Sequence, residues 1–213
     1  MIKGDESHIM FDVPYFQQTR TATCGPACLM MVMKFWDPSF EFSRRVEFNL
    51  WMRSFSLLLF GGTYPFGLAC AAVRTGYKAE IYQKTSFSQN YPSAPRLFDL
   101  FEHVVSRHAR HGHVPLACGT DCMSVIHDSL RRGIPPIAFV RLKPLVGENG
   151  FHWVVVSGAD DRTVWVNDPY VPKNSPAATK KAYPVPLPVF QKALSTDMGR
   201  IARLPPSVVL VYK

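Results

Sequence analysis

Long apolar stretches without internal breaks characterise the first part of the chain. Between Cys24 and Trp36 there are few strand-forming residues, and Pro26 stands where a first helical turn tolerates proline. This pattern predicts a buried helix of about three turns that ends at Asp37–Pro38. Four further helices are predicted downstream: Phe42–Phe60, Phe66–Arg74, Leu97–His108 and Met123–Arg131.

Short β-branched runs separated by turn residues follow. Strands are predicted at Lys78–Tyr82, Ile137–Leu142, His152–Ser157, Val164–Val166 and Val208–Tyr212. The proline-rich stretch Pro172–Pro188 is predicted as a loop, followed by a short helix near Phe190–Leu194. The fold class expected is α+β, with a helical N-terminal half and an antiparallel sheet in the C-terminal half. We expect a single domain over residues 1–213, with a helical lobe at about 18–133 and a β lobe at about 134–213.

Composition narrows the class of protein. Hydrophobic residues make up 47% and charged residues 19% of the 213 residues, as in a globular protein. The longest apolar runs are too short to span a bilayer, and Met1–Met10 carries Asp5 and Glu6 without an apolar core. Five cysteines are an odd number, so at least one is unpaired, and because nothing in the sequence suggests secretion, reduced thiols are expected. A cytoplasmic location is therefore expected.

Positive charge is spread along the chain. The net charge of +8 comes from scattered pairs such as Arg44–Arg45 and Lys180–Lys181, without a long basic block. Nucleic-acid binding would favour a basic stripe interleaved with exposed aromatic residues, so we do not expect it. The charge instead favours acidic partners or substrates.

Cys24 is the first candidate for chemistry. A thiol at the start of a helix lies where backbone N–H groups and the helix dipole favour its thiolate. The same N–H groups can donate to an oxyanion when that thiolate attacks a carbonyl. Gln18, six residues upstream, can bring a side-chain amide to the same point. Alone, Cys24 would more often be a small packing residue.

His152 and Asp168 complete a catalytic arrangement. His152 opens an apolar strand, and Asp168 follows a second strand. If the Gly158–Arg162 turn joins them as antiparallel neighbours, the start of the first lies beside the end of the second. Asp168 then orients one imidazole nitrogen of His152 while the other faces Cys24.

These segments carry a family resemblance. Val13–Gln18 followed by Cys24–Met31 resembles the N-terminal motif of the bacteriocin-processing, double-glycine-leader cysteine peptidases of the papain clan. His152–Val155 resembles the histidine motif of that family, and Asn167–Pro169 its Asp-Pro motif. The resemblance implies a papain-like fold. By matching position it also implies four roles: Cys24 as nucleophile, His152 as base, Asp168 as orienter and Gln18 as oxyanion donor.

The middle of the chain differs from the best-known members. Glu41–Pro65 looks more like a stand-alone bacterial branch of the group, whereas the best-known members are N-terminal domains of ABC transporters. The sequence contains neither transmembrane helices nor a phosphate-binding loop.

The predicted function is that of a peptidase or amidase acting on a peptide or small amide or thioester through a Cys24 acyl-enzyme, without a cofactor. An acyltransferase or amide-forming enzyme would share the first half-reaction. A peptide-binding module without turnover is a third hypothesis.

Other residues have simpler interpretations. His108, His111 and His113 precede Cys118 and Cys122, and these five side chains could gather a metal ion, although their spacing is not a recognised zinc signature. The histidines also fit a basic helix end. Finally, three neighbours of the candidate residues are expected to have no catalytic role: Cys28, Trp153 and Asn167.

Overall fold

The computed structural model describes residues 8–54, 62–86, 114–170, 180–194 and 204–213, with isolated residues 89, 100, 103 and 107. Its helices are α1 (Cys24–Trp36), α2 (Arg44–Ser54), α3 (Pro65–Val73), α6 (Cys122–Arg131), α7 (Leu142–Val146) and α8 (Leu187–Leu194). Its strands are β1 (Ile9–Met10), β2 (Lys78–Gln83), β3 (Leu116–Cys118), β4 (Ile137–Arg141), β5 (Phe151–Ala159), β6 (Thr163–Asn167), β7 (Tyr183–Pro186) and β8 (Ser207–Tyr212). The predicted helix Leu97–His108 lies outside the continuous ranges.

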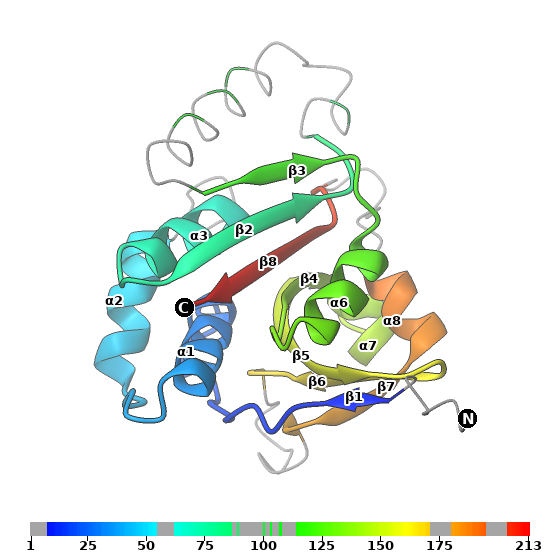
Figure 1. The fold of residues 1–213 in the computed structure, drawn as a ribbon, viewed down its shortest axis with the longest axis horizontal. Helices are drawn as coiled ribbons and strands as arrows, with labels where there is room; N and C mark the ends of the chain where they lie inside the picture. Colours follow the sequence, from blue (N-terminus) through cyan, green and yellow to red (C-terminus); the bar gives the residue numbers. More distant parts are fainter. Residues whose placement is uncertain are drawn as a thin grey trace, which may run out of the picture.

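One mixed sheet organises the described residues. Seven of its strands follow the order β3-β2-β8-β4-β5-β6-β7, and β1 pairs with β5 (Figure 1). The β2–β3 pair is parallel and the other pairs are antiparallel. The α+β class is confirmed. The sheet is not confined to the C-terminal half, because β1 and β2, which lie in the N-terminal half, belong to it.

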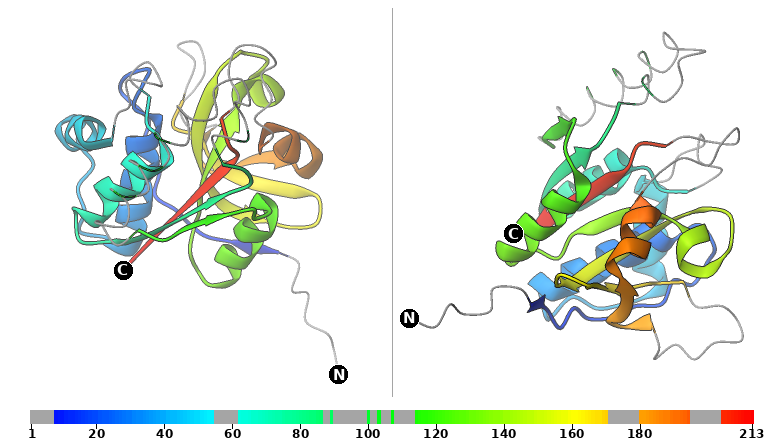
Figure 2. Two further views of the ribbon diagram at one scale, coloured as in Figure 1. Left: turned by 90° about the horizontal axis from the view of Figure 1, so that it is seen from above. Right: turned by 90° about the vertical axis from the view of Figure 1, so that its right-hand side faces the viewer.

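Helices cover both faces of this sheet. In Figure 2 (left), α1, α2 and α3 lie on one side and α6 and α8 on the other. Alternate residues of each central strand enter separate apolar clusters: Trp153 and Val155 of β5 pack with α1 and α3, whereas Val154 and Val156 pack with α6 and α8. A strand buried on both faces is apolar at every position, which explains the continuous β-branched runs of the sequence.

Several predicted boundaries hold. The first helix is α1, and Asp37 caps it through its N–H to the carbonyl of Met33, 2.8 Å away. The third predicted helix is α3, with Gly76 at a φ of +90° just beyond it. The second predicted helix is α2, described up to Ser54; positions 55–60 of that prediction lie outside the described residues.

One predicted loop and one predicted strand differ from the structure. Within Pro172–Pro188, Tyr183–Pro186 forms β7, where Pro184 and Pro186 pair with β6. Both prolines are tolerated because β7 is an edge strand of the described sheet, so their missing N–H groups break no inner ladder. In the predicted strand Ile137–Leu142, Leu142 belongs instead to α7, which turns the chain directly after β4.

Gly158 has a different role from the one predicted. It is not a turn residue, since β5 continues to Ala159 and the turn to β6 occupies residues 160–162. Its position faces β1 so closely that a Cβ atom would lie 2.5 Å from the carbonyl oxygen of Ile9. Glycine at this position therefore permits β1 to approach β5.

Candidate active site

The N-terminus of α1 carries Cys24. The thiol residue is the first of the helix and is 8% exposed. The first turn contains no acidic side chain, so the positive end of the helix dipole acts on Cys24 without a competing carboxylate from its own helix. The next residue, Gly25, packs so tightly that a Cβ atom would lie 2.9 Å from Cβ of Thr63. This close packing fixes the helix start against the residues that precede α3.

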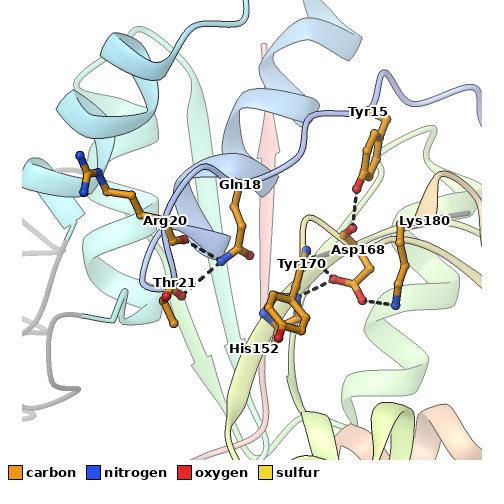
Figure 3. A network of polar contacts seen from close by, with 8 residues as sticks. All are labelled: Tyr15, Gln18, Arg20, Thr21, His152, Asp168, Tyr170 and Lys180. Carbon is orange, nitrogen blue, oxygen red and sulfur yellow. Dashed lines mark hydrogen bonds and ion pairs between the residues drawn. The ribbon is translucent and has the colours of Figure 1, made fainter. Parts of the chain in front are cut away.

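His152 is brought to the same place by β5. Its side chain is buried, and Nε2 lies 2.7 Å from Oδ1 of Asp168 (Figure 3). Burial by itself would lower the pKa of His152, but the charge and hydrogen bond of Asp168, with a hydrogen bond to Cys24, raise it to about 10. Because Asp168 occupies Nε2, we infer that Nδ1 makes the contact with Cys24.

Asp168 follows β6 directly. The β5–β6 register pairs Val155 with Asn167, so the start of β5 lies beside the end of β6, the geometry predicted from the sequence. Oδ1 of Asp168 also accepts from the N–H of Tyr170 at 2.9 Å, and Oδ2 accepts from Nζ of Lys180 at 3.1 Å. Burial would raise the pKa of Asp168, yet the charges of His152 and Lys180 hold it below its usual range.

Gln18 lies in the loop that leads to α1. Its Nε2 donates to the carbonyls of Arg20, at 2.8 Å, and Thr21, at 3.2 Å (Figure 3). Its Oε1 is buried without a hydrogen-bond partner. Both donor hydrogens therefore have acceptors within the loop, and the oxyanion role of Gln18 stays a prediction. Donation to an oxyanion would require this amide to leave at least one of the two carbonyls.

The N-terminal segment Phe11–Gln18 is fastened to the residues around Asp168. Tyr15 Oη donates to the carbonyl of Asp168 at 3.0 Å, and the N–H of Gln18 donates to the carbonyl of Pro169 at 3.0 Å. Asn167, buried beside Asp168, donates from Nδ2 to the carbonyl of Val13 at 2.9 Å. Segments about 150 residues apart are thereby joined on the two sides of the candidate site.

Glu47 of α2 holds the loop between Gln18 and Cys24. Oε1 accepts from the N–H of Thr19 at 2.8 Å and from the hydroxyl of Thr23 at 2.5 Å, and Oε2 accepts from the hydroxyl of Thr19. Glu47 itself is 1% exposed. The same side chains border a surface cavity of about 230 Å³, whose lining is Thr19, Arg20, Thr23, Arg44, Glu47 and Phe48.

Sequence reasoning missed three contributors to this site. Tyr15 belongs to the recognised N-terminal motif, so its position was a usable signal. Glu47 stands in an ordinary amphipathic helix, and Lys180 stands in a stretch interpreted as a loop. Neither has a pattern that predicts a partner, because each acts through a contact between distant segments.

The neighbours of the candidate residues are packing residues. Cys28 is fully buried, and burial followed by the charges of Cys24 and Asp168 raises the pKa of its thiol well above the usual value. Trp153 is 1% exposed and donates from Nε1 to the carbonyl of Thr63 at 2.9 Å. These positions agree with the core roles expected from the sequence.

No group of three potential metal ligands occurs among the described residues. His108, His111 and His113 lie outside them, so the metal hypothesis stays untested. Cys118 is exposed and Cys122 is buried. None of the described helices has the length and apolar character needed to cross a bilayer.

Comparison with known proteins identifies the family. A profile of the Peptidase_C39 like family matches residues 13–202, so the chain belongs to that family. Among solved structures, the fold is similar to that of a Bacillus anthracis protein assigned as a C39-like peptidase, with a TM-score of 0.53 and 14% identity. The match covers 97% of this chain and 98% of that one, and at this identity it establishes the fold alone. No curated protein sequence matches the chain.

Proposed function

We propose that the protein is a papain-like cysteine hydrolase that forms an acyl-enzyme on Cys24. The observation that carries the proposal is the buried His152, whose Nε2 lies 2.7 Å from the Asp168 carboxylate and whose pKa is raised by Asp168 and by Cys24. Three such groups acting together give a nucleophile, a base and an orienting acid. We further propose that residues 1–213 act as one domain, since a single sheet contains strands from both halves of the chain.

In the proposed mechanism, the Cys24 thiolate attacks a substrate carbonyl and His152 gives its proton to the leaving group. Backbone N–H groups at the start of α1 stabilise the oxyanion, and a released Gln18 amide would add a further donor. Water then attacks the thioester, and the neutral imidazole of His152 accepts a proton from it. Asp168 keeps the ring oriented through both steps.

A peptide is the substrate class that the family favours. Double-glycine leader peptides are the first substrates to assay, because the motifs around Cys24 and His152 resemble those of leader peptidases. Acyl transfer to an amine would use the same first half-reaction, and adding an amine acceptor to the assay distinguishes the two outcomes. We also propose a cytoplasmic location, because a reducing compartment keeps a catalytic thiol such as Cys24 in its reduced form.

Thiol labelling tests the proposal without a known substrate. Cys118 is exposed, whereas Cys24 is 8% exposed, so labelling governed by access alone would modify Cys118 first. With limiting iodoacetamide at neutral pH and peptide mass spectrometry, we expect Cys24 to react first. His152→Ala should remove that preference, and the control His127→Ala, on α6, should retain it.

Labelling in order of exposure in the wild-type chain would overturn the hydrolase proposal and favour the peptide-binding module. Turnover provides the second criterion once a substrate is found. Cys24→Ser and His152→Ala should each abolish hydrolysis, while His127→Ala should leave it unchanged.

A further inference from the structure

Lys180 is a buried cation in contact with the candidate catalytic acid. Its side chain is 10% exposed, and Nζ lies 3.1 Å from Oδ2 of Asp168, the oxygen that His152 does not use (Figure 3). The backbone joins the same two residues, because the N–H of Asp168 donates to the carbonyl of Lys180 at 3.1 Å. The ammonium group also lies 5.1 Å from the ring centroid of Tyr183. Lysine is seldom buried unless it is paired, so this position needs a physical reason.

We propose that Lys180 is a positioning residue that shares the Asp168 carboxylate with His152 and so enables the imidazole to give up its proton. The inference rests on the proposed hydrolase function and adds a fourth residue to that site. Without Lys180, the Asp168 carboxylate would interact with His152 alone. The buried imidazolium would then be favoured so strongly that a neutral His152 would be scarce. A second cation on the same carboxylate weakens that preference and keeps Asp168 paired when His152 is neutral.

The effect falls mainly on hydrolysis of the acyl-enzyme. In the free enzyme, a charged His152 is balanced by the Cys24 thiolate. Once Cys24 is acylated that negative charge is gone, and His152 must be neutral to take a proton from water. Water adds to the thioester carbonyl, the proton moves to Nδ1 of His152, and the Cys24 thiolate leaves as the carboxylic acid is released. Through this step Lys180 remains the partner of Asp168.

The groups around the pair determine what a pH titration reports. Among the described residues, the titratable groups that face it from the packed elements are Cys24 and Cys28 on α1, Tyr15 on the N-terminal segment, Tyr170 after β6, Tyr183 on β7, and Asp168, His152 and Lys180 themselves. The pKa values of Tyr15 and Cys28 are raised, principally by burial, so both stay neutral between pH 5 and 9. In an enzyme acylated on Cys24, His152 is therefore the group expected to change charge across that range.

The experiment measures deacylation. The full chain is acetylated on Cys24 with p-nitrophenyl acetate, excess reagent is removed, and loss of the acetyl group is followed by intact-mass spectrometry from pH 5 to 9. The variants are Lys180→Met, Lys180→Gln, Lys180→Arg and, as the control, Lys181→Met. Lys181 is the adjacent lysine but pairs with the exposed Asp12, 2.6 Å away.

The expected result is a displaced pH profile. Lys180 Nζ and His152 Nε2 lie 3.1 and 2.7 Å from the two oxygens of one carboxylate. At an effective dielectric constant near 20, two cations this close interact strongly enough that removing one raises the pKa of the other by about 1 to 2 units. In Lys180→Met and Lys180→Gln, the rise of the deacylation rate should shift to a higher pH by about 1 to 2 units. At pH values below this rise, deacylation should be about 10- to 100-fold slower than in the wild type. Lys180→Arg should restore the wild-type profile, and Lys181→Met should not differ from it.

Lys180→Gln keeps a hydrogen-bond donor for Asp168, so it remains informative if Lys180→Met fails to fold. A uniform loss of rate at every pH, or a Lys180→Gln profile that superimposes on the wild type, would overturn the inference while the hydrolase proposal stands. Absence of any acetyl group on Cys24 in the wild-type chain would instead count against the hydrolase proposal itself.

Discussion

Glu47 provides the most direct test of how the fold supports the site. Its carboxylate accepts three hydrogen bonds from Thr19 and Thr23, in the loop that separates Gln18 from Cys24. Replacement by alanine removes all three acceptor interactions. The buried hydroxyl of Thr23 has one hydrogen, which is then left with the carbonyl of Arg20 as its acceptor. The loop should become less stable and should no longer hold a single conformation.

The size of the effect follows from these contacts. Each hydrogen bond to a charged group contributes about 1.5–3 kcal/mol, so the gross loss is about 4–9 kcal/mol. Part of this loss is offset because the variant no longer buries a carboxylate, and because water in the adjoining cavity can reach Thr19. We expect a net loss of about 2–4 kcal/mol, which corresponds to a fall in melting temperature of about 5–15 °C for a chain of this length.

Glu47→Gln is the matched variant. Its amide oxygen can keep both bonds made by Oε1, and the hydroxyl of Thr19 can rotate to accept from the new NH₂ group. The loss of stability should be less than half that of Glu47→Ala. Urea denaturation followed by tryptophan fluorescence measures stability, and iodoacetamide labelling of Cys24 measures the state of the site.

Glu80→Ala controls for loss of stability alone. Glu80, on β2, accepts from the hydroxyls of Tyr82 and Tyr212, at 2.8 and 2.5 Å, on a different element. It should destabilise the fold without slowing the labelling of Cys24. The reasoning is refuted if the free energy of unfolding of Glu47→Ala lies within about 0.5 kcal/mol of that of the wild type, a difference typical of a neutral surface substitution. It is equally refuted if Glu47→Ala slows labelling no more than Glu80→Ala.

Two further substitutions test the sheet and the acid. Gly158→Ala places a methyl group against the carbonyl of Ile9 and should lower the free energy of unfolding, measured by urea denaturation, by about 1–3 kcal/mol. In a chain that begins at Phe11, this loss should nearly vanish. An undiminished loss would contradict the close-approach explanation. Asp168→Asn should slow the labelling of Cys24 at pH 6 about tenfold or more, because the imidazolium loses its carboxylate partner. Since the folded pKa of Asp168 is depressed, its ionised form stabilises the wild type above pH about 4, and this contribution is lost as the pH falls through the folded pKa. The stability gap to Asp168→Asn, measured by urea denaturation, should therefore narrow at acid pH, and a gap that is constant between pH 7 and 3 would rule this out.

The elements predicted correctly are those whose signals are local. The helix after Cys24 and the strand after His152 are continuous apolar runs, and a run of this kind carries its own periodicity or β-propensity. The strand β7 was missed because its prolines are local breakers, and only its edge position makes them acceptable.

The candidate site divides in the same way. Cys24, His152 and Asp168 could be grouped from spacing, since a hairpin places the start of one strand beside the end of the next. The hydrogen bonds of Gln18 could not be predicted, because both donor hydrogens of its amide are directed at carbonyls within its own loop. The contact between Lys180 and Asp168 could not be predicted either, since it depends on the pairing of β7 with β6, which places Lys180 beside the end of β6.

The place of β8 has a consequence for biosynthesis. Although β8 comes last among the described strands, it lies between β2 and β4 and pairs with both (Figure 1). A nascent chain that has not yet reached Ser207 would hold two open strand edges, which are templates for pairing with other chains. The sheet can join its two parts only after this strand is synthesised, so folding must close a long loop late. We therefore expect the nascent protein to depend on protection from aggregation until β8 has left the ribosome.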